Sequence, residues 1–208
     1  MVTTGTVTHK TITSVIELSR ILGEYGAVKR VTLLPNGEFE SDSHHSLVVA
    51  LTAYQLGQEF APELEAEKLL LYGLVHDLPE LVTGDVPTLL ATEEELADKN
   101  RQDALALEQA CVLFAEYPAI VRALRAYEKG EDDEALFVYW IDKMITIPTH
   151  FPDKGANLRS MGVKNRQDIA AWYAKAQAKL SKRPGTPHPA AVRIMEMAYE
   201  RMRDELLG

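Results

Sequence analysis

Apolar residues recur along most of the chain at the spacing of amphipathic helices. In residues 11–25, for example, Ile12, Val15 and Leu22 fall close to one helical stripe. Proline, glycine and capping residues mark the boundaries of such segments. Together these patterns predict helices over 11–25, 44–60, 62–77, 92–116, 118–129, 135–147, 165–182 and 189–207.

Two segments do not follow the helical pattern. In residues 29–40, Pro35-Asn36-Gly37 separates two short runs, and Asn-Gly is a turn signal, so a small hairpin or extended loop is expected. Residues 148–164 contain proline, glycine and asparagine and are expected to be irregular. The sequence therefore predicts an all-α fold, a helical bundle with one small extended element near residues 29–40.

Two of the predicted helices can be described in more detail. The helix 44–60 follows Ser41-Asp42-Ser43, a cluster of capping residues. The helix 135–147 is apolar on most sides, which predicts a central position. Along the helix 44–60, the large apolar residues are expected to face the core: Leu47, Val48, Leu51, Tyr54 and Leu56.

The length and composition of the chain are those of an ordinary globular protein. With 208 residues, of which 46% are hydrophobic, we expect one domain over 1–208. Its two C-terminal helices, within 165–207, would pack on this domain or form an oligomer interface, for example in a homodimer. The single cysteine, Cys111, cannot form an internal disulfide, which favours a cytoplasmic protein.

Charge and hydropathy limit the partners. A net charge of −9 disfavours binding to nucleic acid or to an anionic membrane, because such proteins need a basic patch. No apolar run approaches the roughly 20 residues that span a bilayer, so no membrane partner is expected. A small phosphorylated substrate is still allowed, since it needs only a local positive pocket.

Candidate chemistry is concentrated in residues 74–88. His76-Asp77 ends an apolar run, where charged groups are rare unless they are paired or bound to a metal. Glu80 lies four positions after His76, so a helix that continues through Asp77 would bring the three side chains onto adjoining parts of one face. Asp85 follows after Gly84. One imidazole and three carboxylates in apolar sequence predict a metal site with acid–base groups beside it.

Two other predicted helices bring similar ligands. Asp142 lies in the apolar helix 135–147, and a buried carboxylate is costly unless it is paired or metal-bound. His44 and His45 begin the helix 44–60, and periodicity does not choose between them. Taken singly, each residue has a simpler explanation, such as an ion pair of Asp142 with a lysine or arginine. Their occurrence together on separate helices favours a metal site.

In their order along the chain, these residues resemble the signature His…His-Asp…Asp of the HD-domain phosphohydrolases. The similarity is closest to the 5′-deoxynucleotidase-like branch, because residues 76–88 resemble its string His-Asp-x-x-Glu…Thr-Gly-Asp-x-Pro-Thr. His45-Ser46 resembles the helix start of that branch, which favours His45 over His44. Arg30 stands where the branch carries a phosphate-contacting arginine. The resemblance covers residues 28–147 and implies an HD-domain helical bundle.

The sequence departs from the pattern of this branch at three places. Val31 stands where an aromatic residue is usual, and His44 stands where an acid is usual. Leu89-Leu90 stands where a lysine is often found. These departures affect the prediction of which nucleotide is bound more than the prediction of the metal site.

The resemblance implies a role for each residue of the pattern. Arg30 would hold the phosphate, Glu80 would be the acid–base group, and Asp85 would orient water or substrate. One divalent metal ion would bind, and mixed imidazole and carboxylate ligands suit Mn, Fe, Co, Ni or Zn better than Mg. The metal ligands implied are His45, His76, Asp77 and Asp142.

The expected function is hydrolysis of a nucleotide phosphate ester, with a deoxynucleoside 5′-monophosphate as substrate. Removal of phosphates from nucleoside triphosphates is an alternative, and the two differ in the positive charge they need around the site. Lys29, Arg30 and Lys143 are candidates for that charge. A module that binds nucleotides without catalysis is a third hypothesis, disfavoured because all four ligands and both additional acids are present.

Overall fold

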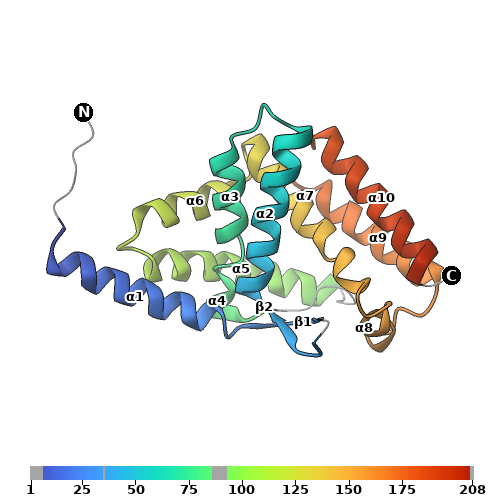
Figure 1. The fold of residues 1–208 in the computed structure, drawn as a ribbon, viewed down its shortest axis with the longest axis horizontal. Coiled ribbons are helices and arrows are strands. Elements are labelled where there is room, and N and C mark those ends of the chain that lie inside the picture. Colours follow the sequence, from blue (N-terminus) through green and yellow to red (C-terminus); the bar gives the residue numbers. More distant parts are fainter. Residues whose placement is uncertain (1–6, 35, 86–92, 207–208) are drawn as a thin grey trace.

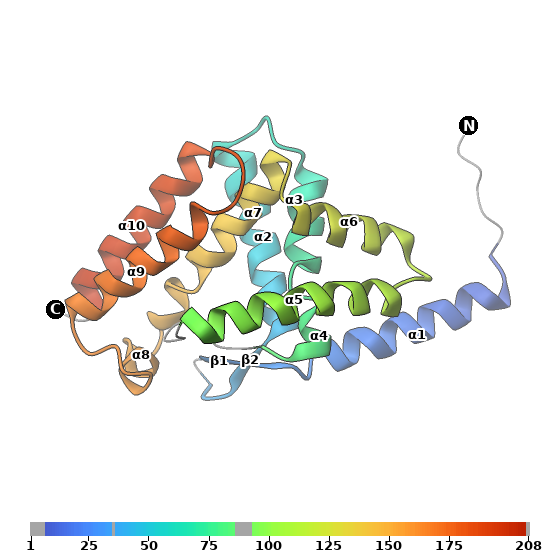
Figure 2. The same ribbon diagram turned by 180° about the vertical axis from the view of Figure 1, so that it is seen from behind.

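A computed structural model describes residues 7–34, 36–85 and 93–206, with side chains from residue 102 onward in the last segment. In these residues the chain is helical apart from one two-stranded sheet (Figures 1 and 2). The predicted all-α fold is therefore confirmed. The elements, in order, are α1 (His9–Tyr25), β1 (Lys29–Leu33), β2 (Phe39–Ser41), α2 (Asp42–Phe60), α3 (Ala66–Val75), α4 (Glu80–Thr83), α5 (Glu93–Leu113), α6 (Pro118–Lys129), α7 (Asp133–Ile145), the 3-10 helix η1 (Pro148–His150), α8 (Ala156–Ser160), α9 (Arg166–Leu180) and α10 (Pro189–Leu206).

The expected extended element near residues 29–40 is an antiparallel hairpin. At its turn, the N–H of Glu38 donates to Asn36 Oδ1, and Gly37 has φ of 83°, which glycine adopts without strain. Alternation along β1 leaves Lys29 exposed and turns Arg30 inward. Ser41 ends the hairpin and caps α2, because its Oγ accepts the N–H of His44 at 3.2 Å. The hairpin therefore fixes where α2 begins.

The prediction of the buried face of α2 was wrong in part: Val48 and Leu56 pack against the core, but Leu47, Leu51 and Tyr54 are exposed. Leu47 and Leu51 are 48% and 54% exposed, whereas Ala50, Ala53 and other small residues are buried. The reason is the neighbouring helix α3, which passes so close that a Cβ on Gly73 would lie 2.4 Å from Ala50 Cα. Only small side chains fit such a crossing, so size outweighs hydrophobicity on this face.

His76 and Asp77 lie beyond the end of α3. This helix begins at Ala66 rather than at Pro62, and it ends at Val75, so the prediction of a helix continuing through Asp77 was wrong. The N–H of Glu80 nevertheless donates to the carbonyl of Asp77 at 2.9 Å, which keeps the chain coiled into α4. Oxygens of Asp77 and Glu80 consequently lie within 4.8 Å of each other, as the sequence spacing suggested.

The central position of α7 is confirmed. Phe137, Val138 and Ile141 are completely buried, and α7 contacts α2 and α3 on one side and α10 on the other (Figure 1). A smaller apolar cluster with Ile147 and Ile169 lies between η1, α8, α9 and α10. The segment predicted to be irregular thus contains η1 and α8. No helix among the described residues combines the length and the apolar character needed to span a bilayer.

Arg183, just after α9, connects the C-terminal helices to the bundle. Its guanidinium lies 4.4 Å from the ring centre of Tyr139 and 5.7 Å from that of Tyr127. It also donates to the carbonyl of Glu128 at 2.9 Å. Gly130 makes room for this arginine, since it has φ of 63° and a Cβ there would lie 2.9 Å from Arg183 Nη1. The loop between α6 and α7 is therefore held by a residue from beyond α9.

The α2–α3 crossing gives a test of the fold. We expect Gly73→Ala to lower the free energy of unfolding by about 2–3 kcal/mol, because the new methyl group meets the backbone of Ala50. Gly23→Ala is the matched control, since nothing lies within 4 Å of a Cβ there, and it should stabilise α1 by up to about 1 kcal/mol. Urea denaturation measures both, and equal effects of the two substitutions would contradict the close crossing.

Candidate metal centre

Three helices bring an imidazole or a carboxylate to one buried point. His45 lies in the first turn of α2, His76 directly follows α3, and Asp142 lies near the end of α7. His45 Nε2 is 3.0 Å from Asp142 Oδ1, and His76 Nε2 is 3.7 Å from the same oxygen. The three side chains are buried, and one ligand atom of each lies within 4.8 Å of the others. This is the spacing of groups that share one cation.

Asp77 supplies a fourth group at the same point. Its Oδ2 lies 3.1 Å from His76 Nε2 and 3.7 Å from His45 Nε2. His44, in contrast, is partly exposed, and its Nδ1 lies 3.1 Å from Glu40 Oε1. The structure thus brings together all four residues predicted as ligands and leaves His44 outside the cluster.

Neighbouring groups orient the candidate ligands. His76 Nδ1 donates to the carbonyl of Gly73 at 2.9 Å, which turns Nε2 toward the cluster. Lys143 Nζ lies 2.5 Å from Asp142 Oδ2, which leaves Oδ1 facing the two imidazoles. His76 Nε2 is buried, and although Asp77 Oδ2 lies 3.1 Å away, this nitrogen has hydrogen-bond geometry to no described residue. A buried nitrogen without a hydrogen-bond partner, among two carboxylates and a second imidazole, fits a transition metal ion.

Arg30 reaches the edge of this cluster from β1. Its Nη1 lies 3.1 Å from Asp77 Oδ2, 3.2 Å from Asp42 Oδ1 and 4.0 Å from Glu80 Oε2. Its Nε lies 3.6 Å from Glu40 Oε2. Arg30, the residue predicted to hold phosphate, therefore lies beside the candidate ligands. Asp77 contacts both Arg30 and His76.

The two predicted catalytic acids are also near this point. Glu80 is largely buried, and its Oε2 makes no hydrogen bond to a described residue. Asp85 is half-buried, and its charge acts on Arg30, Asp42 and Glu80. The rest of the motif, 86–88, and the departure at 89–90 lie outside the described residues.

Buried negative charge shifts the proton affinities of this site. Burial raises the pKa of Glu80 to about 10, and the carboxylates of Asp77, Asp85 and Asp42 add to the rise. Burial lowers the pKa of His76, but the Asp77 and Asp142 carboxylates outweigh it and raise this pKa to about 10. Burial, with the charge of Asp77, also raises the pKa of Asp42 to about 6. The site therefore holds protons at neutral pH, which a cation could replace.

Sequence reasoning missed two acids in this region. Glu40 and Asp42 are 2% and 0% exposed, whereas the sequence pattern predicts a capping role for Asp42 and no role for Glu40. Their signal in the sequence was weak, because an acid at a strand end or in a first helical turn is usually solvated. Only the fold shows that both face Arg30.

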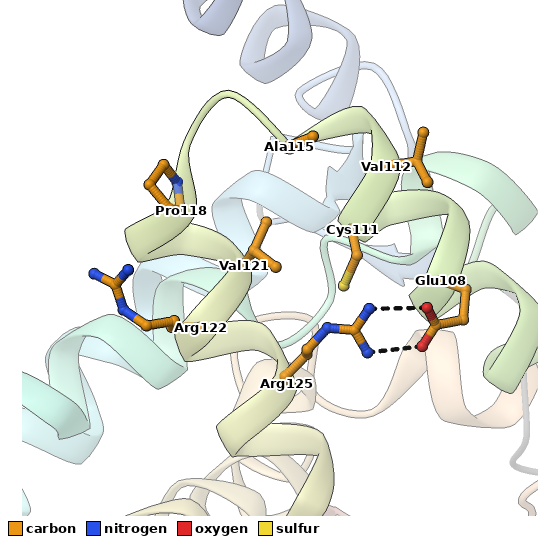
Figure 3. Close-up of a pocket in the computed structure, with 8 residues that line it drawn as sticks. All are labelled: Glu108, Cys111, Val112, Ala115, Pro118, Val121, Arg122 and Arg125. Carbon is orange, nitrogen blue, oxygen red and sulfur yellow. Dashed lines mark hydrogen bonds and ion pairs between the residues drawn. The ribbon is translucent and has the colours of Figure 1, made fainter.

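Two cavities open elsewhere, between α5 and α6. One, of about 420 Å³, is lined by Cys111, Val112 and Val121, and beside it Glu108 and Arg125 join the helices through two 2.8 Å hydrogen bonds (Figure 3). The other, of about 590 Å³, lies against Arg125 and Glu128. The predicted site residues line neither cavity, because they come from β1, α2, α4, α7 and the turns beside these elements.

Known structures share this fold. A family model for the HD domain matches residues 24–182. The crystal structure of a predicted metal-dependent phosphohydrolase from Magnetospirillum magnetotacticum MS-1 superposes with a TM-score of 0.65 at 19% identity, over 95% of this chain and 98% of that chain. A conserved hypothetical protein from Pyrococcus furiosus gives a TM-score of 0.59 at 23% identity, over 90% and 98%. At these identities the likeness shows the fold alone.

Sequence comparison gives a shorter match. The 5′-deoxynucleotidase YfbR of Salmonella paratyphi B (strain ATCC BAA-1250 / SPB7) is 38% identical over 65 residues, which are 29% of this chain and 33% of that protein. YfbR of Salmonella newport (strain SL254) gives the same values. The match thus spans about a third of the length of these curated relatives.

The raised pKa values predict how the metal-free protein responds to pH. His76 and Glu80 both have a pKa of about 10, above their ordinary values of 6.5 and 4.5, so folding takes up protons. This stabilisation is present below the ordinary values and is lost as the pH rises toward 10. In chelator-treated protein we therefore expect the Tm to fall between about pH 7 and about pH 9.5.

Thermal unfolding followed by circular dichroism measures this fall. His76→Gln should reduce it, because the substituted side chain does not titrate. A Tm that stays constant or rises over the interval would contradict the proton uptake.

Proposed function

The chain belongs to the HD-domain family, and we propose that it is a metal-dependent phosphohydrolase that releases phosphate from a deoxynucleoside 5′-monophosphate. The observation that carries this proposal is the shared contact of Asp77. Its Oδ2 lies 3.1 Å from His76 Nε2 and 3.1 Å from Arg30 Nη1, which joins a cation cluster to a guanidinium. A phosphate held by the arginine would lie next to the metal.

The proposed metal ligands fit one divalent ion with mixed nitrogen and oxygen donors. Mn, Fe, Co, Ni or Zn match such donors better than Mg does. When bound, the metal supplies polarisation of the phosphoryl group and a lowered pKa of its bound water. The ligands are His45, His76, Asp77 and Asp142.

The remaining residues would position and protonate the substrate. Arg30 offers a planar guanidinium that can bind phosphate through two parallel hydrogen bonds. Glu80 keeps its proton at neutral pH in the metal-free chain, since its pKa is raised to about 10, which suits donation to the leaving 5′-oxygen. Asp85 would orient the attacking water or the sugar. Phosphoryl transfer needs mainly such positioning and charge compensation.

The charge around the site supports a monophosphate over a triphosphate. Of the three candidate cations, Lys29 is exposed and Lys143 contacts the far oxygen of the proposed ligand Asp142, whereas Arg30 reaches the edge of the cluster at Asp77. The carboxylates of Glu40, Asp42 and Asp77, all within 4.0 Å of that arginine, would repel the additional phosphates of a triphosphate. The nucleotide part of the proposal rests on the partial match to YfbR. Triphosphate hydrolysis and binding without catalysis stay as alternatives.

A substrate panel tests the proposed activity. Metal-stripped protein is supplied with Mn, Co or Mg, and phosphate release is measured from deoxy- and ribonucleoside mono- and triphosphates. We expect metal-dependent release from the monophosphates, reduced by a factor of at least about 100 in Asp77→Ala, because a ligand and the contact to Arg30 are lost together. Release from triphosphates alone would support the first alternative, and stoichiometric metal without release would support the second.

Glu80→Gln separates proton donation from metal binding. It keeps the size of the side chain but cannot supply a proton, so we expect kcat to fall by about 10²–10⁴ with metal content unchanged. Glu59→Gln is a matched control, because Glu59 is exposed on α2. A near-normal kcat in Glu80→Gln would remove this residue from the acid–base role.

A further inference from the structure

Arg30 is surrounded by carboxyl groups. Within 4.0 Å of its guanidinium are oxygens of four carboxylates: Glu40, Asp42, Asp77 and Glu80. Two of them, Asp77 and Glu80, belong to the proposed metal and acid–base groups. The other two, Glu40 and Asp42, have no part in the proposed reaction. Their burial against Arg30 therefore needs a separate explanation.

Of these two residues, Asp42 is the more completely buried. It is 0% exposed at the junction of β2 and α2, and its backbone N–H donates to the carbonyl of Val28 at 3.2 Å, which fixes it beside β1. Its Oδ1 lies 3.2 Å from Arg30 Nη1, and its Oδ2 makes no hydrogen bond to a described residue. A fully buried carboxylate is costly, and Arg30 is the cation that offsets this cost.

Glu40 is held in a different way. Its Oε1 lies 3.1 Å from His44 Nδ1, and its Oε2 is 3.6 Å from Arg30 Nε, beyond hydrogen-bond range. Asp42 and Asp77 are the carboxylates that hydrogen-bond the guanidinium. Because Asp77 also faces the two imidazoles, a cation in the cluster would compete with Arg30 for it. Asp42 also has an oxygen within 4.8 Å of Asp77 and Glu80, but among the described residues it is not within 4.0 Å of either imidazole, so a cation held by His45 and His76 would leave its bond to the arginine in place.

We propose that Asp42 is a positioning residue that fixes the Arg30 guanidinium at the phosphate subsite. It anchors Nη1 on the side of β2 and α2, so that the arginine stays beside the metal ligands when Asp77 is engaged there. Without this anchor, Asp77 is the one remaining carboxylate among the described residues that hydrogen-bonds the guanidinium, and the position of Arg30 then depends on a group that the metal needs. This inference rests on the proposed function only in assigning phosphate to Arg30.

The sign of one measurement separates positioning from simple charge. Removing a negative charge next to an anion site should tighten phosphate binding if Asp42 acts only through its charge. If Asp42 positions Arg30, phosphate binding weakens instead. Isothermal titration of inorganic phosphate into the Mn-loaded protein gives the affinity without requiring any turnover. We expect Asp42→Ala to weaken it by about tenfold and Asp42→Asn by less, because asparagine keeps an acceptor oxygen.

A double-substitution cycle shows whether Asp42 acts through Arg30. In an Arg30→Ala background, Asp42→Ala should cause no additional loss of phosphate affinity, whereas independent effects would add. Metal content and Tm of each variant serve as folding controls, and Glu59→Gln on the exposed side of α2 is the charge-matched control. Asp42→Asn keeps the test valid if Asp42→Ala does not fold.

Three results would overturn the positioning role. They are tighter or unchanged phosphate binding in Asp42→Asn, additive losses in the cycle, and an Arg30→Ala affinity equal to that of the unsubstituted protein. Substrate turnover is measured separately. If Asp42→Ala weakens phosphate binding only when Arg30 is present, but no nucleotide in the panel releases phosphate, the nucleotidase activity is rejected and the positioning role of Asp42 is kept.

Discussion

The contact between α2 and α3 at Ala50 and Gly73 sets the geometry on which the site depends. Because no side chain separates the two backbones there, the helices that carry His45 and His76 are held at a fixed, short distance. The two imidazole rings consequently lie with their centres 5.5 Å apart. Asp142 then reaches the same point from α7, the helix with the most buried surroundings. The small residues at this crossing thus keep the two imidazoles close together.

The site is built from charges that would not remain buried singly. Asp142 is paired with Lys143 and His45, Asp77 with His76 and Arg30, and Asp42 with Arg30. Burial and neighbouring carboxylates together raise the pKa of Glu80, and the carboxylates of Asp77 and Asp142 raise that of His76 against the effect of burial. A bound cation stabilises a buried cluster with an excess of carboxylates. The free energy of unfolding of such a protein therefore depends on how much metal is bound.

Much of this arrangement could be predicted from the sequence, for identifiable reasons. The hairpin follows from Asn36-Gly37, the central place of α7 from its apolar surface, and the meeting of the four proposed ligands from the resemblance to the HD-domain signature. The errors have a common cause, namely that local patterns do not report distances between helices. Nothing near Leu47 or Leu51 indicates that α3 approaches the opposite face of α2, and nothing near Asp42 indicates that Arg30 lies against it. The helix predicted from residue 62 begins at Ala66, after the turn at 62–65.

The contacts of Arg183 bear on how far the functional unit extends. Tyr127 packs edge-on against His76, with ring centres 5.9 Å apart, and Arg183 covers the same tyrosine. The wall behind the proposed ligand is therefore completed by a residue outside the motif-bearing segment 28–147, and one position beyond the family match at 182. A fragment cut at the end of the motif would keep every proposed ligand but lose this backing. The smallest piece of the chain that can be expected to preserve the site is thus defined by its aromatic and guanidinium contacts, not by its signature residues.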